Sequence, residues 1–127
     1  MTAKVVDASA LAALLFGEAE GTAVAERLRG ADLIAPALLP FEIANACIEK
    51  MRREPDRRDA LMVAFGMLDR MEVGIVEVDH VEVLGLADRS GLTAHDASYL
   101  WLARRMGYDL VTLDRGLAAA GATGPLA

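Results

Sequence analysis

The chain of 127 residues has a hydrophobic fraction of 54% and, with 19 acidic against 13 basic side chains, a formal net charge of −6. This length fits one domain, residues 1–127, and the negative charge argues against nonspecific binding of nucleic acid by the whole surface. The single cysteine, Cys47, excludes an intrachain disulfide and a cysteine-based metal site, and no apolar run approaches the ~20 residues of a membrane span, so we expect a soluble protein of the reducing cytoplasm.

Strands and helices alternate along the first part of the chain. A β-branched run at 4–6 predicts a strand, and the apolar residues 9–16 that follow it predict a buried helix. An amphipathic helix is expected at 22–29, followed by a short strand at 33–35. A proline at the start and basic residues in the last turn then indicate a helix over 40–53.

The same alternation continues through the second part of the chain. Asp56 can cap a helix that reaches about residue 71, and a strand is expected at 74–78. Two helices follow, at 80–90 and 93–106, and then the last clear strand at 110–113. The tail after this strand is rich in alanine and glycine and can hold a short helix and one edge strand.

Strands that alternate with single or paired helices indicate an α/β fold. Such strands lie parallel, and helices cover both faces of their sheet. We therefore expect a three-layer α/β/α sandwich with a central parallel sheet of four to five strands. In this architecture the carboxyl ends of the strands and the neighbouring helix starts face one crevice, where residues distant in sequence can meet.

Four carboxylates stand where predicted strands end or predicted helices begin. Asp7 and Asp114 follow strands, whereas Glu42 and Asp96 lie in the first turns of helices. Each also has a structural explanation: Asp7 can be a helix N-cap, Glu42 can be favoured by the helix dipole, and Asp96 completes a Thr-x-x-acid capping box. Taken one at a time, both interpretations remain open for each residue.

The four acids together favour a metal site. Two carboxylates about 4 Å apart repel by roughly 4 kcal/mol at an effective dielectric of 20, which is a large share of the stability of a small domain. A divalent cation or shared protons must offset this repulsion. Sets of carboxylate oxygens suit Mg²⁺ or Mn²⁺, and such a metal activates water for attack on a phosphoryl group. The expected reaction is hydrolysis of a phosphodiester.

These motifs resemble those of the PIN-domain ribonucleases, in particular the VapC-type toxins of bacterial toxin and antitoxin pairs. The resemblance rests on VVDAS at 5–9, EIAN at 42–45, LTAHDA at 92–97 and TLD at 112–114. It implies a PIN-like fold, an endoribonuclease with RNA as its substrate, a cognate antitoxin and a homodimer. It also implies an acidic site that binds Mg²⁺ or Mn²⁺, formed by Asp7, Glu42, Asp96 and Asp114, with supporting polar residues Ser9, Asn45 and Thr112. Ala8 stands where the family often has a second hydroxyl residue.

Basic side chains are candidates for RNA contacts, although such residues are usually solvated helix faces. The candidates are Arg52, Arg53, Arg104, Arg105 and Arg115.

Two alternative functions remain. A haloacid-dehalogenase-like phosphatase also has an aspartate after its first strand, but it requires a second aspartate two residues later, where this chain has Ser9. The non-enzyme alternative is a PIN-like module that binds RNA or protein without cleavage. An intact set of four mutually repelling carboxylates argues against that alternative.

Overall fold

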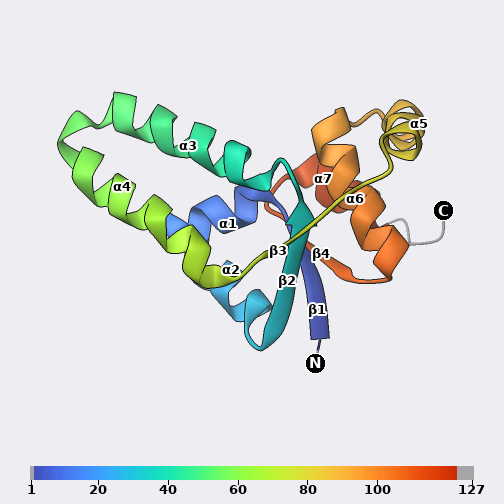
Figure 1. Ribbon diagram of the computed structural model, residues 1–127, viewed down its shortest axis with the longest axis horizontal. Coiled ribbons are helices and arrows are strands. Elements are labelled where there is room, and N and C mark those ends of the chain that lie inside the picture. The colour runs from blue at the N-terminus through green and yellow to red at the C-terminus, as the bar shows by residue number, and fades with distance from the viewer. Residues whose placement is uncertain (1, 123–127) are drawn as a thin grey trace.

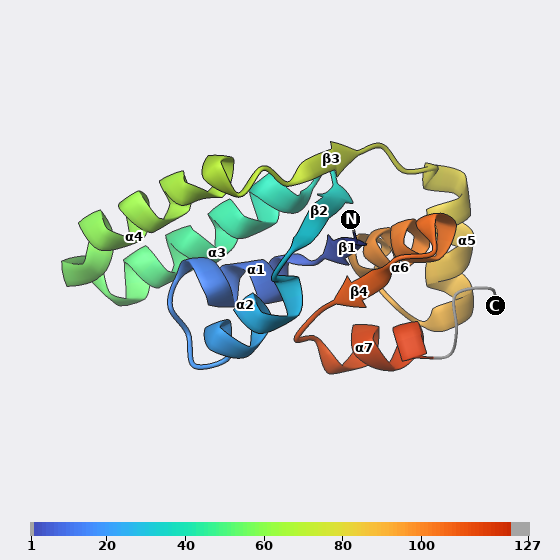
Figure 2. The same cartoon turned by 90° about the horizontal axis from the view of Figure 1, so that it is seen from below.

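The computed structural model describes residues 2–122 and has a parallel sheet between two groups of helices (Figure 1 and Figure 2). The sheet has the order β3-β2-β1-β4, formed by β1 (Thr2–Val6), β2 (Ala31–Pro36), β3 (Gly74–Val76) and β4 (Asp109–Val111). One group of helices comprises α1 (Ala8–Leu15), α2 (Gly21–Leu28), α3 (Leu39–Arg53) and α4 (Arg58–Gly66). The other comprises α5 (His80–Ser90), α6 (Ala94–Met106) and α7 (Arg115–Ala122). The predicted three-layer α/β fold with a parallel sheet is confirmed.

The register of the central strand β1 places the first and last parts of the chain side by side. Val5 pairs with Ile34 of β2 on one side and with Leu110 of β4 on the other. The backbone N–H of Asp7 continues the ladder by donating to the carbonyl oxygen of Val111 at 3.1 Å. Because the strands are parallel, the residues that follow β1 and β4 emerge at the same edge of the sheet.

The core packs against both faces of this sheet. Val5 and Val6 are fully buried, as expected for a central parallel strand that is covered on both sides. Leu11 of α1 and Ile43 of α3 belong to the same buried cluster, and α6 contributes Leu100. The apolar side chains of α1, α3 and α6 thereby fix the first turns of these helices close to the sheet edge.

The helix predicted from Asp56 to about residue 71 is divided in the structure. A 3₁₀ turn at Pro55–Arg57 precedes α4, and a second 3₁₀ segment, Met67–Met71, follows it. The residue before α4 is Arg57, and it makes no side-chain capping bond, so the prediction that Asp56 caps this helix is wrong. The reason is that the 3₁₀ turn, which begins at Pro55, includes Asp56.

The other predicted helices agree with the structure to within one or two residues. The helix at 80–90 has the predicted bounds, and Thr93 is the N-cap of α6. The strand expected at 74–78 ends at Val76, and the strand expected at 110–113 lies at Asp109–Val111. The short helix expected in the tail is α7, whereas an edge strand after it would lie outside the described residues.

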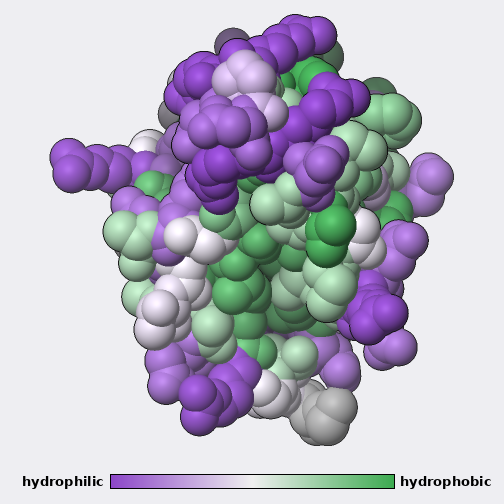
Figure 3. All heavy atoms as spheres, turned by 90° about the vertical axis from the view of Figure 1, so that its left-hand side faces the viewer, coloured by the Kyte–Doolittle hydropathy of each residue, from purple (hydrophilic) through white to green (hydrophobic). Residues whose placement is uncertain are grey.

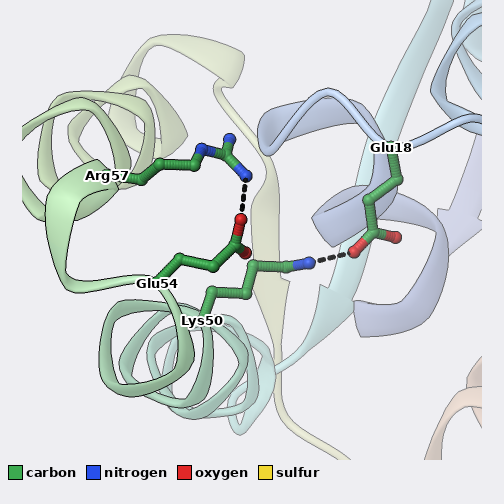
Figure 4. A network of polar contacts seen from close by, with 4 residues as sticks. All are labelled: Glu18, Lys50, Glu54 and Arg57. Atoms are coloured by element: carbon green, nitrogen blue, oxygen red, sulfur yellow. Dashed lines mark hydrogen bonds and ion pairs between the residues drawn. The ribbon is translucent and has the colours of Figure 1, made fainter.

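Two ion pairs stabilise the projecting pair of helices α3 and α4 (Figure 4). Lys50 of α3 pairs with Glu18, which follows α1, and so holds α3 against the first part of the chain. Arg57 and Glu54 pair at 3.2 Å across the turn between α3 and α4. Both pairs are partly exposed, so each contributes at most about 1 kcal/mol.

Apolar side chains gather on the end of the molecule where α3 and α4 project, below polar side chains (Figure 3). The exposed apolar residues of these two helices include Phe41, Met62 and Val63, with exposed fractions of 72%, 53% and 71%. Within residues 2–122, no helix is long and apolar enough to span a bilayer.

Candidate active site

The four predicted acids lie at the carboxyl edge of the sheet or at helix starts beside it. Asp7 follows β1 directly, and Asp114 lies between β4 and α7. Glu42 is in the first turn of α3, and Asp96 is in the first turn of α6. Two acids thus come from the sheet edge and two from the helices that flank it.

Asp7 is a buried carboxylate with a hydrogen-bond donor at each oxygen. Its side chain is 3% exposed. Oδ1 accepts hydrogen bonds from Ser9 Oγ at 2.8 Å and from the backbone N–H of Ala10 at 3.0 Å, and Oδ2 accepts one from Thr112 Oγ1 at 2.6 Å. The bond from Ala10 makes Asp7 the N-cap of α1, as the structural explanation expected. The two hydroxyl donors go beyond what a cap requires.

The hydroxyls of Ser9 and Thr112 also connect Asp7 to the segment that carries Asp114. Ser9 Oγ accepts a hydrogen bond from the backbone N–H of Leu113 at 3.0 Å, and Thr112 Oγ1 accepts one from the backbone N–H of Asp114 at 3.0 Å. Each hydroxyl thus accepts from this backbone and donates its own proton to Asp7. The pair therefore orients one acid and positions the backbone of another.

Glu42 is held by a residue that the sequence did not single out. Tyr99, in the second turn of α6, donates a hydrogen bond from its phenol to Glu42 Oε1 at 2.5 Å. Tyr99 is 1% exposed, and Glu42 is half-buried. A signal was present in the sequence: Tyr99 lies three residues after Asp96, hence on the same helix face, and a buried tyrosine needs a partner for its hydroxyl.

Asp96 and Asp114 make local hydrogen bonds at helix starts. The backbone N–H of Asp96 donates to Thr93 Oγ1 at 3.2 Å, which is one half of the predicted capping box. Oδ1 of Asp114 accepts from the backbone N–H of Leu117 at 2.8 Å, so Asp114 caps α7. Asp96 is half-buried and Asp114 is exposed.

Burial and the charges of neighbouring acids make ionisation of Asp7, Glu42 and Asp96 unfavourable. Burial is the main cause that raises the pKa of Asp7, against which its three hydrogen bonds act, and the charge of Asp96 raises it further. Burial likewise raises the pKa of Glu42, with smaller contributions from Asp96 and Asp7. The pKa of Asp96 is raised by burial and then by the charge of Asp114. The four carboxylates therefore share one electrostatic environment.

The chemistry of these donors fits a divalent cation. Carboxylate oxygens are the ligands that Mg²⁺ and Mn²⁺ prefer, and positive charge would relieve the repulsion that raises these pKa values. Among residues 2–122, no three side chains of histidine, cysteine, aspartate or glutamate are already gathered as a preformed metal cage. The acids therefore lie close enough to repel one another, but in the described residues they do not form a closed metal cage.

The other predicted site residues lie at different distances from the acids. Asn45, one turn along α3 from Glu42, is exposed and makes no hydrogen bond to the four acids. Arg52 and Arg53 are exposed in the last turn of α3, about 15 Å along the helix axis from Glu42. The last turn of α6 carries Arg104 and Arg105, whereas Asp96 lies in its first turn.

Two of the basic candidates have a clear local setting. Arg104 Nη2 donates to the backbone carbonyl of Ala120 at 3.2 Å and so connects α6 to α7. Arg115 is exposed and begins α7 directly after Asp114. Of the five arginines proposed as RNA contacts, Arg115 is the one adjacent in sequence to a proposed metal ligand.

Comparison with known proteins identifies the class to which this fold and site belong. Residues 4–122 match the PIN domain, and the chain belongs to the PIN-domain family. Within that family it is of the VapC type. It is 37% identical over 120 residues to Ribonuclease VapC3 of Pyrobaculum aerophilum, with 90% of this chain and 91% of that protein covered. It is 38% identical over 124 residues to Ribonuclease VapC9 of Mycobacterium tuberculosis, with 92% and 90% covered.

A solved structure has a similar fold. The crystal structure of PAE2754 from Pyrobaculum aerophilum matches with a TM-score of 0.74 and 30% sequence identity. The match covers 93% of this chain and 84% of that one.

Proposed function

We propose that the protein is a Mg²⁺- or Mn²⁺-dependent endoribonuclease and the toxin of a toxin and antitoxin pair in the cytoplasm. The observation that carries the proposal is a buried Asp7 and three further acids beside the same sheet edge, which repel one another in pairs, in a chain similar to proteins named Ribonuclease VapC. A buried carboxylate that repels its neighbours is costly unless a cation is bound. A module that only binds RNA or protein would not need such a buried carboxylate.

The four acids have two roles in the proposed reaction, to hold the cation and to accept a proton. Asp7, Glu42, Asp96 and Asp114 would hold the cation, while Ser9 and Thr112 keep the Asp7 carboxylate in one orientation. When bound, the cation supplies a water of lowered pKa and stabilises negative charge on the phosphoryl group. One of the carboxylates accepts the proton of the attacking water. Water forms the new bond to phosphorus and the RNA 3′-oxygen leaves, so the products carry a 5′-phosphate and a 3′-hydroxyl, without attack by the 2′-hydroxyl.

In this proposal, RNA is bound at the acidic site and by basic side chains, and not by the whole surface. The net charge of −6 repels a polyanion over most of the surface, so the phosphates must be held by the cation and by nearby basic side chains. Arg115 is placed for this role because it adjoins Asp114. Arg52, Arg53 and Arg105 lie farther away and can contact more distant parts of a long RNA.

The proposed protein partners have an available surface. The exposed apolar side chains of α3 and α4, among them Phe41, Met62 and Val63, can bind the antitoxin or a second copy of the chain. We propose both an antitoxin complex and a homodimer. Co-purification with the product of the adjacent gene and sedimentation of the isolated chain measure the two assemblies separately.

The decisive experiment is cleavage of total RNA by the purified protein in Mg²⁺, followed by mapping of the new 5′ ends. We expect cleavage that stops in EDTA and fragments that carry a 5′-phosphate. Asp7→Asn should lower the rate by roughly 10²-fold or more, because such a site supplies several kcal/mol to the transition state.

The matched control is Asp56→Asn, which removes the same charge from an exposed residue of the turn before α4. It should leave the rate unchanged. A 2′,3′-cyclic phosphate, or an Asp7→Asn variant as active as the wild type, would exclude the proposed mechanism.

A further inference from the structure

Tyr99 combines a buried ring with a hydroxyl that is hydrogen-bonded to Glu42. Its side chain is 1% exposed, and its neighbours in α6, Leu100 and Leu102, are equally buried. The hydroxyl has one proton to donate, and that proton goes to Glu42 Oε1 at 2.5 Å. Burial and Glu42 raise the pKa of this phenol, and the nearby backbone of Ala8, the residue after Asp7, acts against them. Tyr99 thus lies between the residue that follows Asp7 and the Glu42 carboxylate.

Glu42 needs such a partner more than Asp7 does. A glutamate has one more rotatable bond than an aspartate, and Glu42 is half-buried, whereas Asp7 is fixed by three donors. The hydrogen bond from Tyr99 joins residues that are 57 positions apart, so it holds the first turn of α3 to α6. It occupies one oxygen of the carboxylate and restricts its rotation.

We propose that Tyr99 is a positioning residue that holds the Glu42 carboxylate in place for a divalent cation. The inference rests on the proposed function, because it assigns a supporting residue to the same acidic site. Partners that orient metal-binding carboxylates typically change metal affinity by 10–100-fold when they are removed. The alternative is that the phenol only satisfies its own burial, in which case its loss would leave metal binding unchanged.

The test is Mn²⁺ affinity, measured by the electron paramagnetic resonance signal of free Mn²⁺ at equilibrium. Tyr99→Phe keeps the ring that packs in the core and removes only the hydroxyl. We expect about 10–100-fold weaker binding of Mn²⁺ by this variant. The chain provides a matched control in its other tyrosine: Tyr108→Phe removes a hydroxyl from a half-buried residue just after α6, at the opposite end of that helix from Asp96, and its affinity should equal that of the wild type.

A double-mutant cycle separates positioning from a general structural effect. If Tyr99 acts through Glu42, Tyr99→Phe should cause no further loss of Mn²⁺ affinity in a Glu42→Ala background. Equal losses in both backgrounds would overturn the inference. If Tyr99→Phe does not fold, replacement of Tyr99 by 4-fluorophenylalanine fills the same volume without a donor, and the same comparison applies.

The outcomes distinguish this inference from the proposed function. If the wild type binds Mn²⁺ and cleaves RNA but Tyr99→Phe binds equally well, the role of Tyr99 is wrong and the proposed function stands. If the wild type binds no Mn²⁺, the proposed metal site is wrong, and so is the proposed role of Tyr99.

Discussion

The acidic site has an inner pair and an outer pair of carboxylates, and the two pairs are held differently. The inner pair, Asp7 and Glu42, receives hydroxyl donors from residues 105 and 57 positions away. The outer pair, Asp96 and Asp114, makes backbone hydrogen bonds within its own helix starts. Tertiary structure therefore fixes the inner acids, while local structure places the outer ones and leaves them more exposed.

This difference shows which part of the site is preorganised. Removing a donor from the inner pair should cost stability, because it leaves a buried charge less well bonded. Removing charge from the outer pair should instead relieve repulsion. The following predictions test this contrast, beginning with the largest expected effect.

Thr112→Val tests the inner pair, because valine has nearly the shape of threonine but cannot donate to Asp7. The variant also leaves the backbone N–H of Asp114 without its partner. We expect it to lower the free energy of unfolding by about 1.5–3 kcal/mol in EDTA, the range for a hydrogen bond to a charged group. Urea denaturation measures the loss.

The control for this variant is Thr22→Val, at an exposed position of α2, which should change stability little. If both variants have the same stability as the wild type, the Asp7 carboxylate does not depend on its hydroxyl donor, and the distinction between the two pairs fails.

The pH dependence of stability tests whether the acids are strained when ionised. Burial raises the pKa of Asp7, Glu42 and Asp96 in the folded state. Between the ordinary carboxyl pKa of about 4 and these raised values, the folded state binds more protons than the unfolded state. In EDTA the free energy of unfolding should therefore fall as the pH rises through this window, and the penalty should disappear as the pH falls back through it.

Glu42→Gln sharpens this measurement because glutamine can still accept the Tyr99 hydrogen bond but does not titrate. Its stability should fall less steeply with rising pH than that of the wild type. Glu49→Gln, an exposed position on the same helix, is the matched control and should retain the wild-type slope. Identical slopes for all three proteins would count against a raised pKa of Glu42.

Asp96→Asn tests the outer pair and should have the smallest effect, with the opposite sign to Thr112→Val. It removes repulsion with Asp114, whereas the Thr93 cap depends on the backbone N–H and is retained. We expect a gain in EDTA of at most about 1 kcal/mol, because both acids are partly solvated. Thermal melting beside Asp88→Asn, an exposed position of α5, measures it. A loss of stability would favour the capping-box explanation of Asp96.

Local signals in the sequence predicted the helices well. The bounds of α5 agree, and α6 is capped by Thr93 and ends at Gly107, whose φ of 69° is the left-handed conformation that glycine adopts readily. These features are set by residues within one helical turn. Strand bounds were less accurate because pairing sets them: β2 begins at Ala31, opposite Thr2 of β1, although the apolar pattern begins two residues later.

Contacts between distant residues could not be read from the pattern. The sequence predicted that acids at strand ends and helix starts would share one crevice. In the structure, the charges of neighbouring acids contribute to the raised pKa values of Asp7, Glu42 and Asp96, and the shared crevice stays a prediction. The sequence did not predict the strand order, which decides that β4 lies beside β1. Nor did it predict the bond between Tyr99 and Glu42, because that contact depends on how α6 packs against α3. The metal-binding role of the acids remains a prediction.

The pairing of β1 with β4 has a consequence for protein synthesis. When synthesis has reached only the end of α6, two parts of the site are still missing. These are Thr112, whose hydroxyl donates to Asp7, and the carboxylate of Asp114. Nascent chains, and chains terminated before β4, therefore lack part of the proposed catalytic site. In the proposed mechanism, cleavage can therefore begin only after β4 and Asp114 have been synthesised.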